Sequence, residues 1–339
     1  MVQRVVMVDA EVPFKGGHWD RLVAAIEPDR LIAVSSKDPV AVEAALGEAE
    51  IAILAGDLDE RHLNAPKLRW IHCDHAGLTK SARPEVFERG LIVTGSAGRS
   101  GPALAEHVLM FSLVLCSRFP EFLEAQKRHE WRRTPEMSDL RALYGRTMGI
   151  LGMGHTGREL ATRAKAFNMR VLGYRRRDLP CPPGIDRMYS SDKGETIDPI
   201  LEEADIVALV LNLSDATYHL IDERAIERMK KSAIIVNLSR GGVIDQAALI
   251  AALKEGRLAG AGLDVTDPEP PAPDDPIWDT PNLLITPHFT PAVPDKVDRS
   301  LDVITENLRR YRAGRPMLNR ITEEDLWTKD STASLRPLE

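Results

Sequence analysis

The sequence predicts an α/β protein built from two Rossmann-like, doubly wound domains with parallel sheets. The chain has 339 residues, which at roughly 100 to 200 residues per domain corresponds to two domains. Short apolar, β-branched runs alternate with helical patterns, as in a parallel sheet covered on both faces. The alternation is interrupted once, by a long apolar helix, and then starts again.

The alternation is already present in the first part of the chain. Apolar, β-branched runs predict strands, and the amphipathic stretches between them predict helices. The expected strands are residues 3–8, 31–35, 51–55, 69–72 and 91–94, and the expected helices are residues 19–26 and 38–48. Residues 102–117 follow as a long apolar helix with Pro102 in its first turn, a position that proline favours. That helix leads away from the first sheet.

From Thr147 the alternation restarts with a clearer rhythm. The expected strands are residues 147–151, 170–174, 206–211, 233–237, 260–265 and 283–286. A last helix begins near Lys296 and ends by Arg315, and residues 318–339 are expected to form a polar tail. Periodicity alone leaves open whether the closing helix returns to the first domain.

The composition excludes several classes of protein. Hydrophobic residues make up 43% and charged residues 28%, as in ordinary globular proteins. The net charge of −7 argues against a dedicated nucleic-acid binder. No stretch approaches the roughly 18 apolar residues of a membrane span, and Cys73, Cys116 and Cys181 lie too far apart for a zinc site or a disulfide framework. We therefore expect a cytoplasmic protein without a metal site, a membrane anchor or a nucleic-acid partner.

Residues 152–157, Gly-Met-Gly-His-Thr-Gly, lie between an expected strand and the helix that starts at Arg158. The first glycine allows a tight turn, the second lets the backbone approach a pyrophosphate, and the third lets helix and strand pack closely. Alternatives are a turn without ligand and the Gly-rich turn of a methyltransferase. The candidates for cofactor contact at this turn and the following strand ends are Gly152, Gly154, His155, Thr156, Gly157, Leu211, Asn212 and Ser239.

Arg175, Arg176 and Arg177 stand where an NAD-binding domain places an acidic residue for the ribose 2′-hydroxyl. Guanidinium groups cannot accept a hydrogen bond from a diol, but they pair well with a phosphate. The run therefore predicts NADP as the preferred cofactor, with NAD possible. An ordinary solvated basic turn is the alternative.

Arg240, Glu269 and His288 each stand at or just past the carboxyl end of one of the last three expected strands. Such ends form the ligand crevice of a doubly wound sheet. A histidine can donate a proton to a carbonyl oxygen, and a carboxylate behind it stabilises the imidazolium. An arginine fork can bind a carboxylate. We predict these three residues as catalytic, although each alone also fits an ordinary strand end or loop.

With these motifs the sequence resembles the D-isomer-specific 2-hydroxyacid dehydrogenases, a family that includes glyoxylate and hydroxypyruvate reductases. The segments that carry the resemblance are residues 151–157, 237–242, 263–270 and 286–288. It implies that Arg240, Glu269 and His288 are the catalytic Arg, Glu and His of the family. It also implies that Asp264 contacts the nicotinamide carboxamide.

The resemblance further implies the domain organisation. Residues 1–100 plus 290–339 would form a discontinuous substrate domain, and residues 101–289 a dinucleotide-binding domain. A substrate-carboxylate loop is implied at His75, Ala76 and Gly77, whose backbone amides would hold the carboxylate alongside Arg240. A homodimer is typical of such proteins.

The chain departs from the family pattern around this loop. Thr79 replaces the usual Asp, and His72 and Asp74 precede His75. Two extra imidazoles beside an anion site would widen or recharge the pocket, and plain surface polar residues are the alternative. After His288 the sequence reads Phe-Thr-Pro where the family usually has small residues. Both departures concern the identity of the substrate.

The sequence thus predicts a reductase of small 2-oxo acids, of glyoxylate or hydroxypyruvate size, to (R)-2-hydroxy acids with NAD(P)H, preferably NADPH. One alternative is a non-catalytic regulator that senses dinucleotide, as the corepressors related to this family do. Another is a relative of formate or phosphonate dehydrogenases. Formate dehydrogenases usually carry Gln at the position of Glu269, so this residue argues against them.

Overall fold

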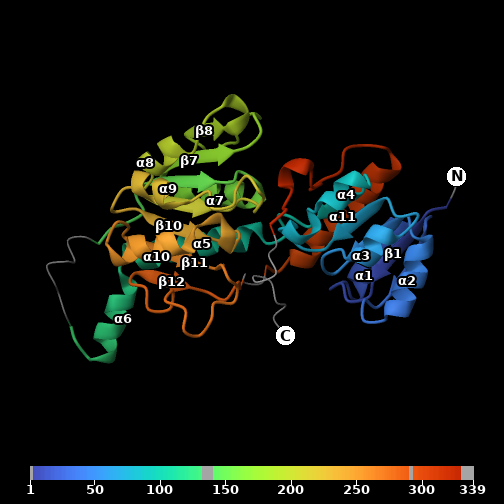
Figure 1. The fold of residues 1–339 in the computed structure, drawn as a ribbon, viewed down its shortest axis with the longest axis horizontal. Coiled ribbons are helices and arrows are strands. Elements are labelled where there is room, and N and C mark those ends of the chain that lie inside the picture. The colour runs from blue at the N-terminus through green and yellow to red at the C-terminus, as the bar shows by residue number, and fades with distance from the viewer. Residues whose placement is uncertain (1–2, 132–139, 290–292, 330–339) are drawn as a thin grey trace. The chain divides into compact units, whose positions relative to one another are not determined.

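The computed structural model describes residues 3–131, 140–289 and 293–329, and the chain divides into two compact units. Among these residues, unit 1 comprises 3–100, 214–216 and 293–329, and unit 2 comprises 101–131, 140–213 and 217–289. Each unit contains one parallel sheet flanked by helices (Figure 1). The predicted α/β class with two Rossmann-like sheets is confirmed.

Unit 1 is built on a five-stranded parallel sheet in the order β2-β1-β3-β4-β5. The strands are β1 (Val5–Asp9), β2 (Arg30–Val34), β3 (Ile51–Leu54), β4 (Trp70–Cys73) and β5 (Ile92–Gly95). The helices are α1 (Gly17–Ile26), α2 (Pro39–Glu48), α3 (Glu60–Asn64), α4 (Pro84–Glu88) and α11 (Lys296–Arg312). Because side chains alternate along each strand, Val6 and Val8 enter one core and Met7 enters the core on the other face.

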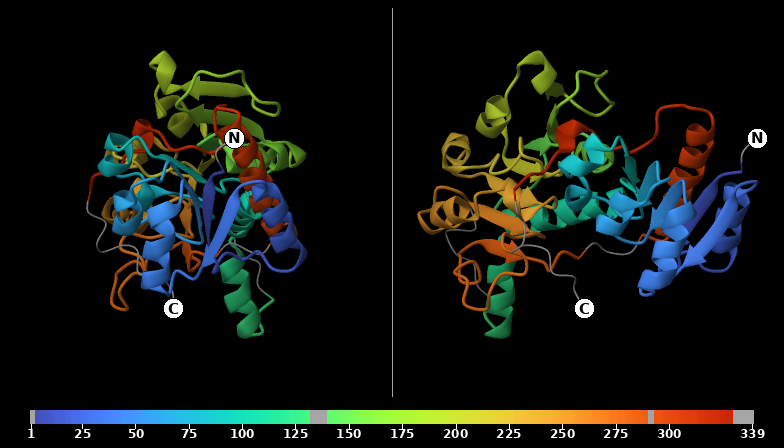
Figure 2. Two further views of the ribbon diagram at one scale, coloured as in Figure 1. Left: turned by 90° about the vertical axis from the view of Figure 1, so that its right-hand side faces the viewer. Right: turned by 45° about the vertical axis from the view of Figure 1, so that its right-hand side comes forward.

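The closing helix α11 returns to unit 1, which periodicity could not decide. Leu301, Ile304 and Leu308 are fully buried and share a core with the β-branched residues of β1 and β3. The hydroxyl of Tyr311 donates a hydrogen bond to Glu50 Oε1 at 2.9 Å. Both views of Figure 2 show the red α11 alongside the blue elements of unit 1.

The segment after α11 is more structured than the expected polar tail. Arg320 forms an antiparallel bridge with Thr94, and Ile321 joins a core of unit 1. The backbone N–H of Trp327 donates to Ala82 O at 2.9 Å. The prediction was wrong for residues 318–329, where spaced apolar residues are separated by charges, and residues 330–339 lie outside the described part of the chain.

Unit 2 is built on a seven-stranded parallel sheet in the order β12-β11-β10-β9-β6-β7-β8. The strands are β6 (Thr147–Leu151), β7 (Arg170–Arg175), β8 (Arg187–Ser190), β9 (Ile206–Leu209), β10 (Ile234–Asn237), β11 (Gly260–Leu263) and β12 (Leu283–Ile285). The helices are α5 (Gly101–Cys116), α6 (Phe119–Lys127), α7 (His155–Ala166), α8 (Asp198–Glu203), α9 (Glu223–Arg228) and α10 (Gln246–Lys254). The strand order reverses between β6 and β9, and ligands bind at such a switch point.

Two elements of unit 2 were not predicted. Strand β8 has four residues, RMYS, and lies at the sheet edge, where only Tyr189 and Ser190 are buried. The Arg187 guanidinium lies 4.5 Å from the centroid of the Tyr189 ring. Helix α6 buries none of its residues, and its apolar Phe119 and Leu123 are 46% and 42% exposed. Within the described ranges no helix has the length and apolar character needed to cross a membrane.

Candidate active site

The glycine-rich turn joins β6 to α7 at the switch point of the unit 2 sheet. Gly152 has a φ of 107°, and a Cβ there would lie 2.6 Å from the carbonyl oxygen of Val210. A Cβ on Gly157 would lie 2.1 Å from the carbonyl oxygen of Gly152. These two glycines are therefore required by the packing of the turn itself.

Gly154 differs from the other two glycines, because a Cβ there would meet no protein atom within 4 Å. It is the N-cap of α7, no side chain caps the helix, and the first turn contains no acidic residue. His155 and Thr156 begin the helix. An open approach to uncapped amide groups at the positive end of a helix fits a dinucleotide pyrophosphate. The residues present at this turn therefore fit the cofactor expected from the sequence.

Arg175 ends β7, Arg176 and Arg177 follow it, and the three side chains have different environments. The Arg175 guanidinium donates to the carbonyl oxygens of Leu179 and Pro180, so its fork holds the turn that follows. The carbonyl oxygen of Arg176 accepts a hydrogen bond from the Ser190 hydroxyl at 2.7 Å. The Arg177 side chain is exposed. The run is thus a structured basic turn rather than three equivalent free cations.

The turn after β10 carries Arg240 and is organised by Asn237, which is 1% exposed. Asn237 Oδ1 accepts from the Ser239 N–H at 3.0 Å and from its hydroxyl at 2.7 Å. Asn237 Nδ2 donates to the Arg240 carbonyl oxygen at 2.9 Å. A Cβ on Gly241 would lie 1.9 Å from the carbonyl oxygen of Thr266. The Arg240 turn is therefore pressed against the segment that leads to Glu269.

Glu269 and His288 form the closest ionisable pair among the predicted site residues. Glu269 Oε1 lies 2.5 Å from His288 Nδ1, and the two side chains are 22% and 35% exposed. Because the carboxylate takes the Nδ1 side, the Nε2 atom of His288 is directed away from it. The structure therefore brings two of the three predicted catalytic residues into direct contact, and Arg240 follows β10, which pairs with β11, the strand that precedes Glu269.

The backbone that presents His288 is held by Asp264. His288 has a φ of 50°, a left-handed conformation that non-glycine residues seldom adopt. Its N–H donates to the Asp264 carbonyl oxygen at 2.9 Å, and the Phe289 N–H donates to Asp264 Oδ1 at 3.0 Å. Asp264 accepts both hydrogen bonds and is 2% exposed. The orientation of His288 therefore depends on Asp264.

Asp264 is in turn fixed by two residues that sequence reasoning missed. The Thr286 hydroxyl donates to Asp264 Oδ1 at 2.5 Å and lies 3.1 Å from His107 Nε2. The hydroxyl proton is used on the carboxylate, so His107 Nε2 must donate to Thr286. Burial lowers the pKa of His107 while Asp264 raises it, and the net shift is downward. A histidine on an apolar helix gave no signal of this role.

The predicted substrate loop lies in unit 1, directly after β4. Gly77 has a φ of 76°, as a tight turn requires, and Ala76 is exposed. His75 Nδ1 lies 3.2 Å from the carbonyl oxygen of Ala76. His72 is fully buried with both ring nitrogens bonded, so it does not line a pocket as a second free imidazole.

Leu211, Asn212 and Ser239 lie at the carboxyl ends of β9 and β10, at the same edge of the unit 2 sheet as the glycine-rich turn. In the part of the chain that is described, no cluster of three or more His, Cys, Asp or Glu side chains could hold a metal ion.

The sheet order and the glycine-rich turn of unit 2 are those of a dinucleotide-binding oxidoreductase. The profile of the family described as D-isomer specific 2-hydroxyacid dehydrogenase, NAD binding domain, matches residues 109–290. The chain belongs to the D-isomer specific 2-hydroxyacid dehydrogenases and is an NAD(P)-dependent oxidoreductase. The family predicted from the sequence is thereby confirmed.

Individual relatives agree with this assignment. A glyoxylate reductase of Korarchaeum cryptofilum is 35% identical over 283 residues, which cover 82% of this chain and 83% of the relative. The crystal structure of a D-isomer specific 2-hydroxyacid dehydrogenase family protein from Aeromonas salmonicida has a TM-score of 0.73 at 30% identity, covering 95% of this chain and 100% of that one. A family member from Xanthobacter autotrophicus, solved with NADPH and MES, has a TM-score of 0.77 at 25% identity, covering 95% and 99%.

The glycine-rich turn yields a paired prediction. We expect Gly154→Ala to leave the unfolding temperature of the free protein unchanged, because its Cβ meets no protein atom within 4 Å, but to weaken dinucleotide binding at least about tenfold by blocking close approach. Gly157→Ala should weaken dinucleotide binding and should also lower the unfolding temperature. Thermal unfolding and fluorescence titration with NADPH measure both effects. Unchanged affinity in Gly154→Ala would remove this position from the cofactor site.

Proposed function

We propose that the protein reduces a small 2-oxo acid to the (R)-2-hydroxy acid with a nicotinamide dinucleotide, preferably NADPH. The observation that carries the proposal is the contact between Glu269 and His288 at the carboxyl edge of a dinucleotide-binding sheet. The relative named glyoxylate reductase supports a substrate of that size. A proton-donating pair also favours catalysis over a regulator that only senses dinucleotide.

In this proposal His288 is the general acid. Glu269 holds Nδ1–H, so Nε2–H faces the carbonyl oxygen and gives up its proton as the carbonyl carbon gains a hydride. The bound cofactor supplies that hydride. The carbon–oxygen double bond becomes a single bond, and the product carries one new C–H and one new O–H bond. Glu269 stabilises the imidazolium before transfer.

The other residues bind and orient. Arg240 offers a planar fork to the substrate carboxylate and polarises the adjacent carbonyl. The backbone of His75, Ala76 and Gly77 would hold the same carboxylate. We further propose that unit 1 is the substrate domain and unit 2 the cofactor domain. The turn at residues 152–157 would hold the pyrophosphate.

The remaining cofactor contacts follow from the strand ends of unit 2. Asp264 would contact the nicotinamide carboxamide, and Leu211, Asn212 and Ser239 would line the cofactor. The basic turn of Arg175, Arg176 and Arg177 would accept a 2′-phosphate. The three cysteines are free and are consistent with a reducing cytoplasm.

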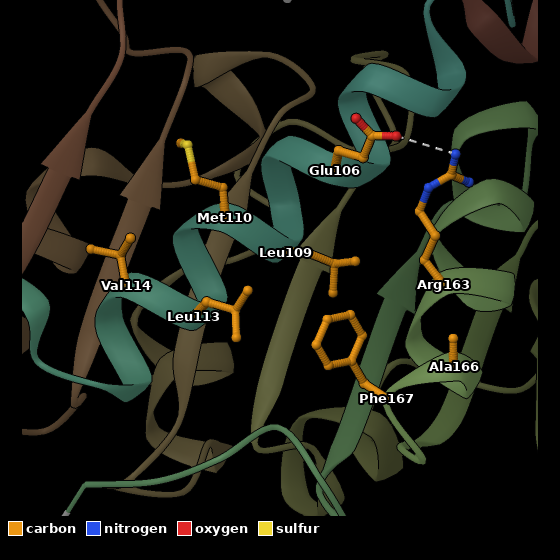
Figure 3. A pocket seen from close by; sticks show the side chains of 8 residues that line it. All are labelled: Glu106, Leu109, Met110, Leu113, Val114, Arg163, Ala166 and Phe167. Atoms are coloured by element: carbon orange, nitrogen blue, oxygen red, sulfur yellow. Dashed lines mark hydrogen bonds and ion pairs between the residues drawn. The ribbon is translucent and has the colours of Figure 1, made fainter.

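We propose a homodimer because unit 2 carries an apolar groove. The groove has a volume of about 550 Å³ and lies between α5 and α7 (Figure 3). Glu106 and Arg163 form an ion pair of 3.4 Å at its rim. Met110 and Leu113 are 44% and 42% exposed. Such apolar surface on a soluble protein is typical of a subunit interface.

Substitutions of His288 and Glu269 should have different kinetic effects. His288→Asn should lower kcat by roughly 10² or more without changing the dissociation constant of the cofactor. Glu269→Gln should move the pH profile of reduction to lower pH, because loss of the carboxylate destabilises the imidazolium. Rates of NADPH oxidation with glyoxylate between pH 5 and 9 measure both. His129→Asn, at an exposed histidine, is the control. Near-normal turnover in His288→Asn would contradict the assignment.

The basic turn predicts cofactor preference. A charge-assisted bond to the 2′-phosphate is worth roughly 10- to 150-fold in favour of NADPH. Arg175→Asp should invert the preference, because it adds an acceptor for a ribose hydroxyl and repels the phosphate. Values of kcat/KM for both cofactors at low ionic strength decide this. Arg187→Gln, which removes an arginine stacked on Tyr189, is the control. If wild type and variant both used the two cofactors equally, Arg175, Arg176 and Arg177 would form an ordinary solvated turn without a role in cofactor preference.

The groove predicts the oligomeric state. The wild-type protein should sediment as a dimer, and Leu113→Arg should sediment as a monomer, because a buried unpaired charge is costly at an apolar interface. Analytical ultracentrifugation measures the mass. Val40→Arg, at an isolated apolar residue that is 77% exposed in unit 1, should remain dimeric. A monomeric wild type would overturn the proposal.

A further inference from the structure

A chain of buried hydrogen bonds runs through the carboxyl edge of the unit 1 sheet. Trp70 Nε1–H donates to Thr94 Oγ1 at 2.9 Å, and Thr94 Oγ1 lies 3.0 Å from His72 Nδ1. His72 Nε2 lies 3.1 Å from Ser96 Oγ, which donates to Asp74 Oδ1 at 2.6 Å. These five side chains come from β4, β5 and the loops that follow them, and all are buried.

The direction of every proton in this chain is determined. The Asp74 carboxylate can only accept, so the Ser96 hydroxyl donates to it and must accept from His72 Nε2–H. Burial lowers the pKa of His72 to about 3, and the ring is neutral at pH 7. Its Nδ1 therefore accepts from the Thr94 hydroxyl. The donors of Trp70, His72 and Ser96 each have one acceptor in the chain, and the Thr94 hydroxyl also lies 3.5 Å from the Ile71 carbonyl oxygen.

This chain of hydrogen bonds ends at Arg99, and only some of the N–H donors of its guanidinium have protein partners. Arg99 Nη1 donates to Asp74 Oδ2 at 3.0 Å and also to the Asp74 carbonyl oxygen. Across residues 3–131, 140–289 and 293–329, its Nε and Nη2 donors have no other protein partner. The Arg99 side chain is 17% exposed, whereas that of Asp74 is 0% exposed. Part of the Arg99 side chain thus remains exposed to solvent.

A second cation of unit 1 interacts electrostatically with Arg99 and Asp74. Lys296 is the first residue of α11 and is partly buried. Burial lowers the pKa of its ammonium, the Arg99 guanidinium lowers it further, and the Asp74 carboxylate raises it. Among the described residues the ammonium has no ion-pair or hydrogen-bond partner. Arg99 and Lys296 carry two positive charges against the one negative charge of Asp74, while the Asp57 carboxylate lies 3.6 Å from His75 Nε2.

This charge adjoins the proposed substrate loop. Asp74 directly precedes His75, and the Ser96 N–H donates to the His75 carbonyl oxygen at 3.0 Å. A Cβ on Gly95 would lie 2.8 Å from the same oxygen, so β5 and the loop are in close contact. The hydrogen bonds of Asp74 and Ser96 therefore fix Arg99 relative to the loop.

We propose that Arg99 and Lys296 bind a second anionic group, a carboxylate or a phosphate, on the 2-oxo acid. The inference rests on the proposed function, and it names a substrate class: 2-oxo acids with two anionic groups. Arg99 contributes its unused donor edge, and Lys296 contributes charge. The competing interpretation is that Arg99 only neutralises buried Asp74, and the test below separates the two.

The test is binding of unreactive analogues to the full chain saturated with NADP, measured by calorimetry. Pentanedioate and pentanoate differ by one carboxylate, and 4-phosphonobutanoate replaces that carboxylate by a phosphonate. We expect either dianionic analogue to bind at least about tenfold more tightly than pentanoate, since a charge-assisted bond is worth roughly 10- to 150-fold. The tighter of the two identifies the anionic group.

Three variants test the residues. Lys296→Gln leaves the Asp74–Arg99 pair intact, and Arg99→Lys keeps a cation beside Asp74 but loses the fork, so both should fold. Each should reduce the preference for the dianionic analogue several-fold while pentanoate affinity stays unchanged. Lys67→Gln, at an exposed lysine of unit 1, should change neither. Unfolding temperatures check the fold of each variant.

A wild type that binds pentanedioate and pentanoate equally, or a preference that survives both Lys296→Gln and Arg99→Lys, would overturn the inference. Failure of the proposed function has a different signature. In that case no 2-oxo acid, including glyoxylate, is reduced with NADPH or NADH, although dianionic analogues still bind. In steady-state kinetics the variants should raise KM for 2-oxopentanedioate and leave kcat nearly unchanged, as expected for an interaction present equally in the ground and transition states.

Discussion

The parallel register of the unit 2 sheet is the constraint on which the site depends. Leu151 pairs with Leu209, which pairs with Asn237, which pairs with Leu263, so these four strands end at one level. The connection between two parallel strands must cross back over the sheet, so that each strand starts again at the amino-terminal ends of its neighbours. Each strand therefore delivers its next residues to the same side. The glycine-rich turn, the Arg240 turn, Asp264 and His288 are neighbours for this reason.

Within that edge, buried side chains set the positions of the reactive ones. Asn237 shapes the turn that carries Arg240, and Asp264 holds the left-handed residue His288. Both are polar groups that are almost fully buried, and such groups must be hydrogen-bonded to avoid a desolvation cost. Their preferred partners are the backbone groups of the adjacent turns. The hydrogen bonds that the buried Asn237 and Asp264 require therefore also fix the positions of Arg240 and His288.

Sequence patterns predicted the strands well, because β-branched runs bounded by turn residues have few other interpretations. They predicted Glu269 as the carboxylate that supports His288, and the structure adds the distance of 2.5 Å between Glu269 Oε1 and His288 Nδ1. Strand β8 was missed because an edge strand with polar residues lacks the apolar signal. His107 and Thr286 were missed because their role arises from a contact between α5 and the turn after β12, which are far apart in the sequence. The burial of His72 was missed for a similar reason, since its partners Thr94 and Ser96 come from a different strand.

The hydrogen-bond chain through His72 has a consequence for how this region can vary among related proteins. Each hydroxyl in it donates in one direction, so a substitution at any link leaves the next donor or acceptor buried without a partner. We therefore expect evolution to keep or replace as a group the four linked residues Thr94, His72, Ser96 and Asp74. A relative that has exchanged only one of them must have reversed or broken the proton order, and with it the geometry that holds Arg99 beside the loop.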